Sequence, residues 1–128
     1  MPIQQIVVRL RRILRSVVER ALGVHRLRRS YDRVTANVRD PGDIDALLDE
    51  GLKEFDLFTN VCEADLERVP AAGPLVVVAN HPHGVIDGLL LGALLRRKRP
   101  DLRVIGNRWL HEFPALRDLI LDVDPTGG

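Results

Sequence analysis

A short apolar run that ends in a group of ionisable side chains constrains the fold of this chain more than any other feature. Residues 75–79 are uniformly apolar and rich in valine, which is typical of a β-strand buried on both faces. Asp87 and the apolar residues 89–91 indicate that a helix begins shortly afterwards. Because α/β proteins place functional groups in loops at the carboxyl ends of strands, we predict a functional site in residues 80–88.

The segments around this loop predict the fold class. Apolar residues 89–95 predict a helix and residues 102–105 a second strand, and this succession suggests a right-handed crossover with parallel pairing. Residues 59–63 are expected to form another short strand, and residues 121–125 the start of a strand or a loop. The predicted class is α/β, with N-terminal helices followed by a partial parallel or mixed sheet and flanking helices.

A turn and a second helix are predicted before the loop. Asp40 or Asp43 can cap the free amide groups where this helix begins. Apolar residues then recur at helical spacing and are expected to belong to the core: Ile44, Leu47, Leu48, Leu52, Phe55 and Phe58.

The N-terminal segment is strongly basic, although the formal net charge of the chain is only +1. Residues 1–33 carry nine arginines against Glu19 and Asp32, a balance of +7. Apolar residues at alternating spacings of four and three lie along one side of a predicted helix: Ile3, Val7, Leu10, Leu14, Val17, Ala21 and Val24. We therefore predict a basic amphipathic helical arm over residues 1–38.

Two roles for this arm stay open. It can lie in the headgroup region of a membrane with its arginines on anionic lipids, or its apolar side can pack on the rest of the chain. Nucleic-acid binding is disfavoured, since no aromatic residues alternate with the arginines. The chain has no run of 18 apolar residues, and arginines interrupt its N-terminal apolar pattern, which argues against a spanning helix. The single Cys62 excludes an intramolecular disulfide.

The loop over residues 80–88 contains the side chains for acid–base catalysis. His81 or His83 can remove a proton from a hydroxyl group, while Asp87 orients the imidazole and stabilises its charged form. The loop has no serine or cysteine, which favours direct attack by a substrate hydroxyl over a covalent acyl-enzyme. A metal site is the second interpretation and needs Asp87 or His111 as a third ligand. In a third interpretation, one histidine only caps the strand or the helix.

Residues 80–88, Asn-His-Pro-His-Gly-Val-Ile-Asp-Gly, resemble the catalytic block of the glycerolipid (lysophospholipid) acyltransferase superfamily, and most closely its hemolysin-like branch. The similarity extends from about Asp65 to Pro125 and includes residues 73–79, 107–108 and 114–118. The resemblance implies transfer of a fatty acyl group from a thioester of coenzyme A or acyl carrier protein to the hydroxyl of a lysolipid or glycerol phosphate. No bound metal or cofactor is implied.

The resemblance also assigns roles to residues. His81 matches the general base and Asp87 its partner, with His83 in reserve because five residues, rather than the superfamily's usual four, separate His81 from Asp87. The candidate substrate-binding residues are Asn80, Gly84, Gly88, Asn107 and Arg108.

The implied partners are a membrane lipid surface, the lysolipid acceptor and the acyl donor, at the cytoplasmic face of a membrane to which the protein binds peripherally. Residues 39–128 are expected to be the N-terminal portion of an acyltransferase domain. Nothing in them matches the downstream Phe-Pro-x-Gly type motif, so the chain is expected to be a fragment that can be inactive alone. The alternative function is a non-catalytic membrane-binding or lipid-binding module.

Overall fold

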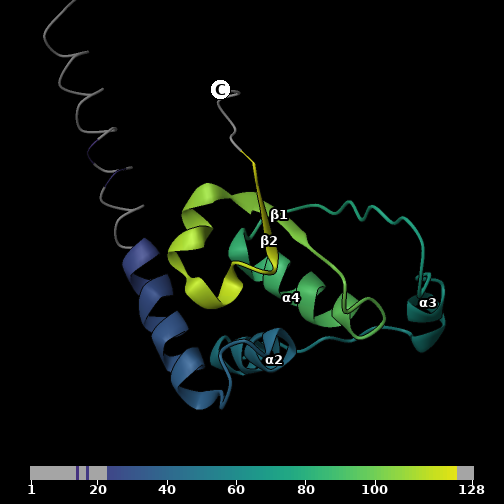
Figure 1. Cartoon of the computed structure of the whole chain (residues 1–128), viewed down its shortest axis with the longest axis horizontal. Helices are drawn as coiled ribbons and strands as arrows, with labels where there is room; N and C mark the ends of the chain where they lie inside the picture. Colours follow the sequence, from purple (N-terminus) through teal and green to yellow (C-terminus); the bar gives the residue numbers. More distant parts are fainter. Residues whose placement is uncertain (1–13, 15–16, 18–22, 124–128) are drawn as a thin grey trace, which may run out of the picture.

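The computed structural model describes Leu14, Val17 and residues 23–123. A helix over residues 23–37 is followed by α2 (Ile44–Glu54), α3 (Glu63–Glu67), α4 (Val85–Arg96), β1 (Val104–Asn107), the 3-10 helices η1 (Arg108–Glu112) and η2 (Pro114–Leu116), and β2 (Ile120–Val123) (Figure 1). The predicted α/β class, with helices before a partial parallel sheet, is confirmed. Most of the predicted N-terminal stripe lies outside the described residues, and Leu14, Val17 and Val24 of that stripe are exposed.

The sheet consists of the parallel pair β1 and β2, with Val104 opposite Ile120 and Asn107 opposite Val123. The connection between them runs through η1 and η2, since parallel strands cannot be joined by a tight turn. The strand expected over residues 102–105 is present as β1, which begins and ends two residues later than expected. Because the strands are parallel, β1 ends at Asn107 and β2 at Val123 on the same edge of the sheet.

The predicted strand over residues 75–79 is wrong. In the described part of the chain these residues pair with no strand, all five are exposed, and Val76 and Val78 are 85% and 89% accessible. Figure 1 draws them as part of the long irregular connection between α3 and α4. Valine favours a strand only where a neighbour accepts its backbone hydrogen bonds and covers its side chain, and neither condition is met here.

Two further expectations differ from the structure. Residues 59–62 are irregular and Glu63 begins α3, so the strand expected over residues 59–63 is also wrong. The helix expected to include Phe55 and Phe58 ends at Glu54, and Phe58 is exposed. Asp56, with a positive φ of 52°, follows the helix end, and the next amide, that of Leu57, donates a 2.8 Å hydrogen bond to the Leu52 carbonyl, which closes the last turn of the helix.

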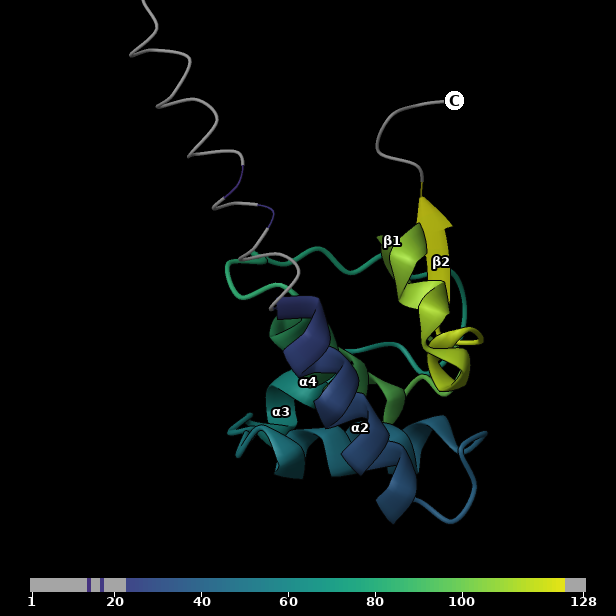
Figure 2. The ribbon, with the colours of Figure 1, turned by 90° about the vertical axis from the view of Figure 1, so that its left-hand side faces the viewer.

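The core lies between α2, α4 and the start of β2. Asp43, one of the two predicted caps, immediately precedes α2, and its side chain accepts a 3.0 Å hydrogen bond from the Ala46 amide. Leu48 and Leu52 of α2 pack with Ala93 of α4 and with Leu119. Figure 2 shows α2 and α4 on one side of the strand pair.

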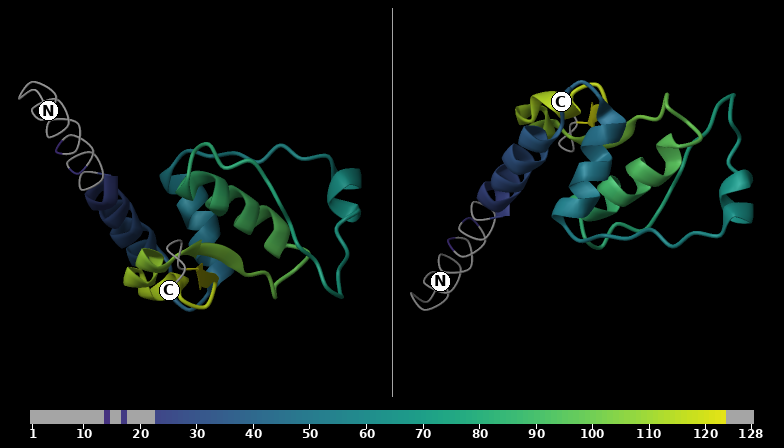
Figure 3. Two further views of the ribbon diagram at one scale, coloured as in Figure 1. Left: turned by 90° about the horizontal axis from the view of Figure 1, so that it is seen from above. Right: turned by 90° about the horizontal axis from the view of Figure 1, so that it is seen from below.

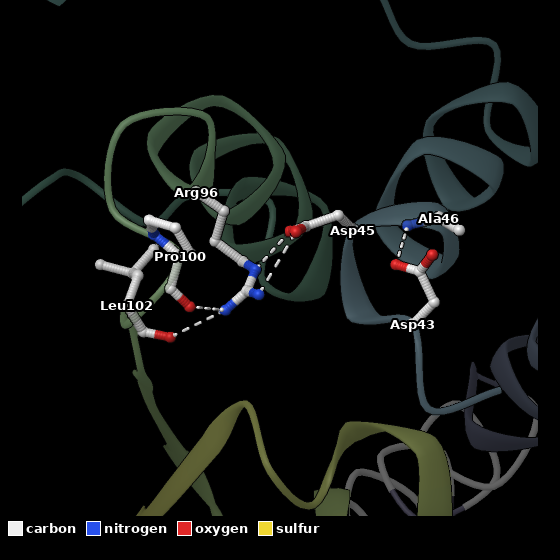
Figure 4. Close-up of polar contacts among 6 residues, drawn as sticks. All are labelled: Asp43, Asp45, Ala46, Arg96, Pro100 and Leu102. Atoms are coloured by element: carbon white, nitrogen blue, oxygen red, sulfur yellow. Dashed lines mark hydrogen bonds and ion pairs between the residues drawn. The ribbon is translucent and has the colours of Figure 1, made fainter. Parts of the chain in front are cut away.

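Two arginines near the end of α4 fix the approach to β1. Arg96 donates to Asp45 of α2 at 2.5 Å and to the carbonyl oxygen of Pro100 at 2.6 Å (Figure 4). Arg99, which is buried, pairs with Asp101 and donates to the Pro70 carbonyl at 3.3 Å. Residues 96–99, Arg-Arg-Lys-Arg, form a basic run at the end of α4, and its first and last members therefore have structural partners.

The helix over residues 23–37 packs against η1, η2 and α2 (Figure 3). The Tyr31 hydroxyl accepts a 2.9 Å hydrogen bond from the Ala115 amide, and its ring lies 4.8 Å from that of Phe113. Arg33 donates to Glu54 at the end of α2, with 2.9 Å between Nε and Oε1. The helix is therefore held by an aromatic contact and by polar contacts.

Replacing Phe113 with alanine is expected to lower the free energy of unfolding by about 3–5 kcal/mol. Phe113 is only 2% exposed and its ring contacts both Tyr31 and Trp109, so truncation leaves a cavity between the helix over residues 23–37 and η1. Chemical denaturation followed by circular dichroism measures the loss. The exposed Phe58 provides the control, since Phe58→Ala removes a ring that is already solvated and should change stability by less than about 0.5 kcal/mol.

The Arg33–Glu54 pair makes stability depend on pH. The hydrogen bond from the Arg33 guanidinium lowers the pKa of the Glu54 carboxyl group below its usual value of 4.5. The stabilisation is therefore fully present above that usual value and is lost as the pH falls through the lower pKa of the folded state. We expect Glu54→Gln to melt at a lower temperature than the parent chain at neutral pH, with the difference disappearing in acid. A difference in melting temperature that is constant with pH would contradict this account.

Candidate active site

Asp87 lies between the two histidines of the loop. Its Oδ2 is 3.6 Å from His81 Nδ1 and its Oδ1 is 3.4 Å from His83 Nδ1. The backbone amide of His83 donates a 2.8 Å hydrogen bond to the same carboxylate. The Asp87 side chain is 16% exposed, whereas those of His81 and His83 are 65% and 73% exposed. The carboxylate is thus held inside the loop, and both imidazoles can be reached from solvent.

The start of α4 positions this carboxylate. Gly84 precedes the helix with a positive φ of 63°, a conformation that strains any residue with a side chain. The amides of Asp87 and Gly88 donate to the Gly84 carbonyl, so Asp87 lies in the first turn. A negative charge is favoured there, at the positive end of the helix dipole.

His81 is the histidine that borders an apolar cavity of about 320 Å³, and His83 is not on its wall. The wall is formed by the helix over residues 23–37, by α2 and α4, and by the segment from β1 to β2. The lining residues are Leu27, Ser30, Tyr31, Val34, Leu47, Leu48, Gly51, Phe55, His81, Gly84, Val85, Gly88, Leu89, Val104, Ile105, Gly106, Asn107, Trp109, Leu110, Leu116, Leu119 and Ile120. An apolar group in this cavity can therefore contact an imidazole.

The candidate substrate-binding residues divide into two groups. Gly84, Gly88 and Asn107 line the cavity, and a Cβ atom built on Gly88 would meet nothing within 4 Å. Asn80 and Arg108 are exposed and lie outside its wall. The Asn107 side chain accepts a 3.2 Å hydrogen bond from the Trp109 amide, which fixes the turn after β1.

His111, the alternative third metal ligand, belongs to a different group. Its Nε2 is 3.6 Å from Asp122 Oδ1, and Arg108 Nε is 3.4 Å from Oδ2 of the same carboxylate. Across Leu14, Val17 and residues 23–123, no three His, Cys, Asp or Glu side chains are placed to hold a metal ion. The predicted loop residues His81, His83 and Asp87 do lie together.

Sequence reasoning did not identify the cavity residues that come from the helix over residues 23–37. Leu27, Ser30, Tyr31 and Val34 occupy positions i, i+3, i+4 and i+7, which lie on one face of a helix. This pattern predicts a buried face but does not show which residues pack against it. Leu47 and Leu48, which the sequence assigns to the core, are both 3% exposed, and both also form part of the cavity wall.

A family model described as Acyltransferase matches residues 60–124, half of the chain. The chain belongs to this acyltransferase family. Within the matched region lie the His81, His83 and Asp87 group, α4 and both strands. No match was found among curated proteins or among solved structures. In this acyltransferase the helix over residues 23–37 and α2 precede the matched region, yet both contribute to the cavity beside His81.

Proposed function

We propose that this acyltransferase is a glycerolipid O-acyltransferase of the hemolysin-like branch. It transfers a fatty acyl group from a thioester of coenzyme A or acyl carrier protein to the hydroxyl of a lysolipid or glycerol phosphate. The observation that carries the proposal is the position of His81, which lies beside Asp87 and on the wall of an apolar cavity. A thioester with its alkyl chain in that cavity would present its carbonyl to the imidazole.

The reaction follows from this arrangement. Since Nδ1 of His81 is on the Asp87 side, Nε2 is available to remove the proton from the acceptor hydroxyl. The hydroxyl oxygen then attacks the thioester carbonyl, the carbon–sulfur bond breaks, and the proton passes from the imidazolium to the departing thiolate. Asp87 stabilises the imidazolium during transfer. The products are an ester and a free thiol.

The remaining candidate residues would hold the substrates. Gly84, Gly88 and Asn107 lie on the cavity wall, which supports contact with the acyl group. Gly88 has open space where a side chain would project, so the reacting carbonyl can approach α4 closely. Asn80 and Arg108 are exposed and can reach the acceptor, with the Arg108 guanidinium suited to its phosphate.

The proposed site of action is the cytoplasmic face of a membrane, to which the basic arm binds peripherally. The exposed Leu14 and Val17 lie in the segment that carries nine arginines, and this composition supports binding to anionic lipids. In the described part of the chain, no helix is long and apolar enough to cross a bilayer.

The test is an assay of the purified chain with acyl-coenzyme A and a lysolipid in anionic vesicles. We expect release of free coenzyme A thiol, with appearance of the acylated lipid, only when the lysolipid is present. Vesicle binding without thiol release would favour the non-catalytic lipid-binding module instead. Thiol release that is independent of the lysolipid would indicate hydrolysis and contradict the proposal.

A further inference from the structure

A second group of charged side chains lies at the carboxyl edge of the strand pair. Asp122 of β2 lies between two side chains of η1, with its Oδ2 3.4 Å from Arg108 Nε and its Oδ1 3.6 Å from His111 Nε2. The His111 Nε2 atom is buried and has no hydrogen-bond partner in the described part of the chain. The carboxylate therefore forms an ion pair with Arg108 on one side and faces an imidazole on the other.

Strand geometry places this carboxylate beside the cavity that His81 borders. Side chains alternate between the two faces of a strand, so Asp122 is on the same face as Ile120, which is buried and lines the cavity. Across the ladder Asp122 is opposite Gly106, which lines the cavity as well. The carboxylate is thus one step beyond the cavity wall, toward the edge where both strands end.

Arg108, the partner of Asp122, is the residue to which the proposed function assigns the acceptor phosphate. Its neighbours Asn107 and Trp109 both line the cavity, and its side chain is 74% exposed, so an acceptor bound beside the cavity can reach it. A phosphate bound to the remaining guanidinium nitrogens then lies close to a carboxylate of like charge. This repulsion is stronger for a phosphate monoester, which is nearly a dianion at neutral pH, than for a diester, which is a monoanion.

The neighbouring charged groups of η1 and η2 are engaged elsewhere. Glu112 pairs with Arg28 at 2.8 Å, and Arg117 Nε donates to the His111 carbonyl at 3.3 Å. Among the residues that the structure describes, only Arg108 and His111 have basic nitrogens within 4.0 Å of the Asp122 carboxylate. Removing the charge of Asp122 therefore acts first on Arg108.

We propose that Asp122 makes this acyltransferase discriminate against dianionic phosphate monoesters, so that its acceptor is a lysolipid whose phosphate is a diester rather than glycerol phosphate. The inference rests on the proposed function, because it assumes that Arg108 meets the acceptor phosphate. Asp122 acts through Arg108 and determines specificity without taking part in proton transfer. Its role is therefore separate from those of His81 and Asp87.

Lysolipid binding tests the inference without any acyl transfer. Lysophosphatidic acid, a monoester, and lysophosphatidylcholine, a zwitterionic diester, are compared with the same acyl chain, as monomers at about pH 8. Trp109 follows Arg108 and is the only tryptophan, so its fluorescence reports binding. We expect the parent chain to bind the monoester no more tightly than the diester. Asp122→Asn should strengthen binding of the monoester at least about threefold relative to the diester, since it removes one nearby unit charge.

Three further variants control this comparison. Asp49→Asn removes the same charge from an exposed position of α2 that is not on the cavity wall, and should leave the ratio of the two dissociation constants unchanged. Asp122→Glu retains the charge and should keep the parent ratio. Arg108→Gln combined with Asp122→Asn should lose the gain for the monoester.

Four results would each overturn the inference: a parent chain that binds the monoester more tightly, an equal effect of Asp122→Asn on both lipids, the same shift with Asp49→Asn, or no binding of either lipid. If Asp122→Asn does not fold, Asp122→Ser replaces it with the same expected shift. The Asp122 side chain is 41% exposed, so neither substitution leaves a buried cavity.

The two proposals can fail separately. A shift of lysolipid preference in Asp122→Asn, without acyl transfer by the parent chain in the thioester assay, would retain the inference and contradict the proposed activity. Acyl transfer to both lysolipids with a ratio of rates that Asp122→Asn leaves unchanged would support the activity and contradict the role of Asp122.

Discussion

His81→Ala is expected to lower acyl transfer by about 10²–10⁴-fold, the usual contribution of a positioned general base. The imidazole is the group on the cavity wall that can take the acceptor proton, and Asp87 Oδ2 lies 3.6 Å from its Nδ1. The measurement is the rate of thiol release in the presence of lysolipid. Since His81 is exposed, its removal should leave the thermal unfolding of the chain nearly unchanged.

His83→Ala is the matched control for this substitution. His83 is four residues from Asp87 and its Nδ1 is 3.4 Å from that carboxylate, yet its side chain is not on the cavity wall. The backbone amide that binds Asp87 is retained in the variant. We expect a loss of less than about tenfold. A loss larger than that of His81→Ala would assign the base to His83 and contradict the mechanism.

The grouping of His81, His83 and Asp87 could be predicted from the sequence because it is local. A loop that enters a helix brings residues four to six positions apart within a few ångströms of one another, whatever the rest of the fold does. The choice between the two histidines could not be made in this way, because it depends on the cavity. That cavity is built largely from Tyr31, Leu47 and other residues far away in the chain.

The secondary structure shows the same difference: features that depend on neighbouring residues could be predicted, and features that depend on distant residues could not. The cap at Asp43 and the helix after Gly84 depend on neighbouring residues, and both were predicted. The strand expected over residues 75–79 depends on a partner strand, which valine content cannot supply. The sequence of residues 96–99 shows a cluster of positive charge, but it does not show that Arg96 and Arg99 pair with Asp45 and Asp101.

Asp87→Asn is expected to reduce acyl transfer by about 10²–10⁴-fold while the loop keeps its conformation. The amide oxygen can still accept the hydrogen bond from the His83 backbone, so the turn before α4 is preserved. What is lost is the negative charge beside His81, and with it the stabilisation of the imidazolium that forms during proton transfer. Circular dichroism and thermal unfolding establish that the fold is retained, and the thioester assay measures the loss.

A double substitution separates this role from independent contributions of the two residues. If Asp87 acts through His81, its charge has no function once the imidazole is gone, so His81→Ala combined with Asp87→Asn should be about as slow as His81→Ala alone. If the loss of rate in the double variant instead equals the product of the two single losses, Asp87 acts on the substrate or on another residue. The reference is His83→Ala combined with Asp87→Asn. Because His83 lies outside the cavity wall, Asp87→Asn should lower the rate of acyl transfer in this background as much as it does in the parent chain.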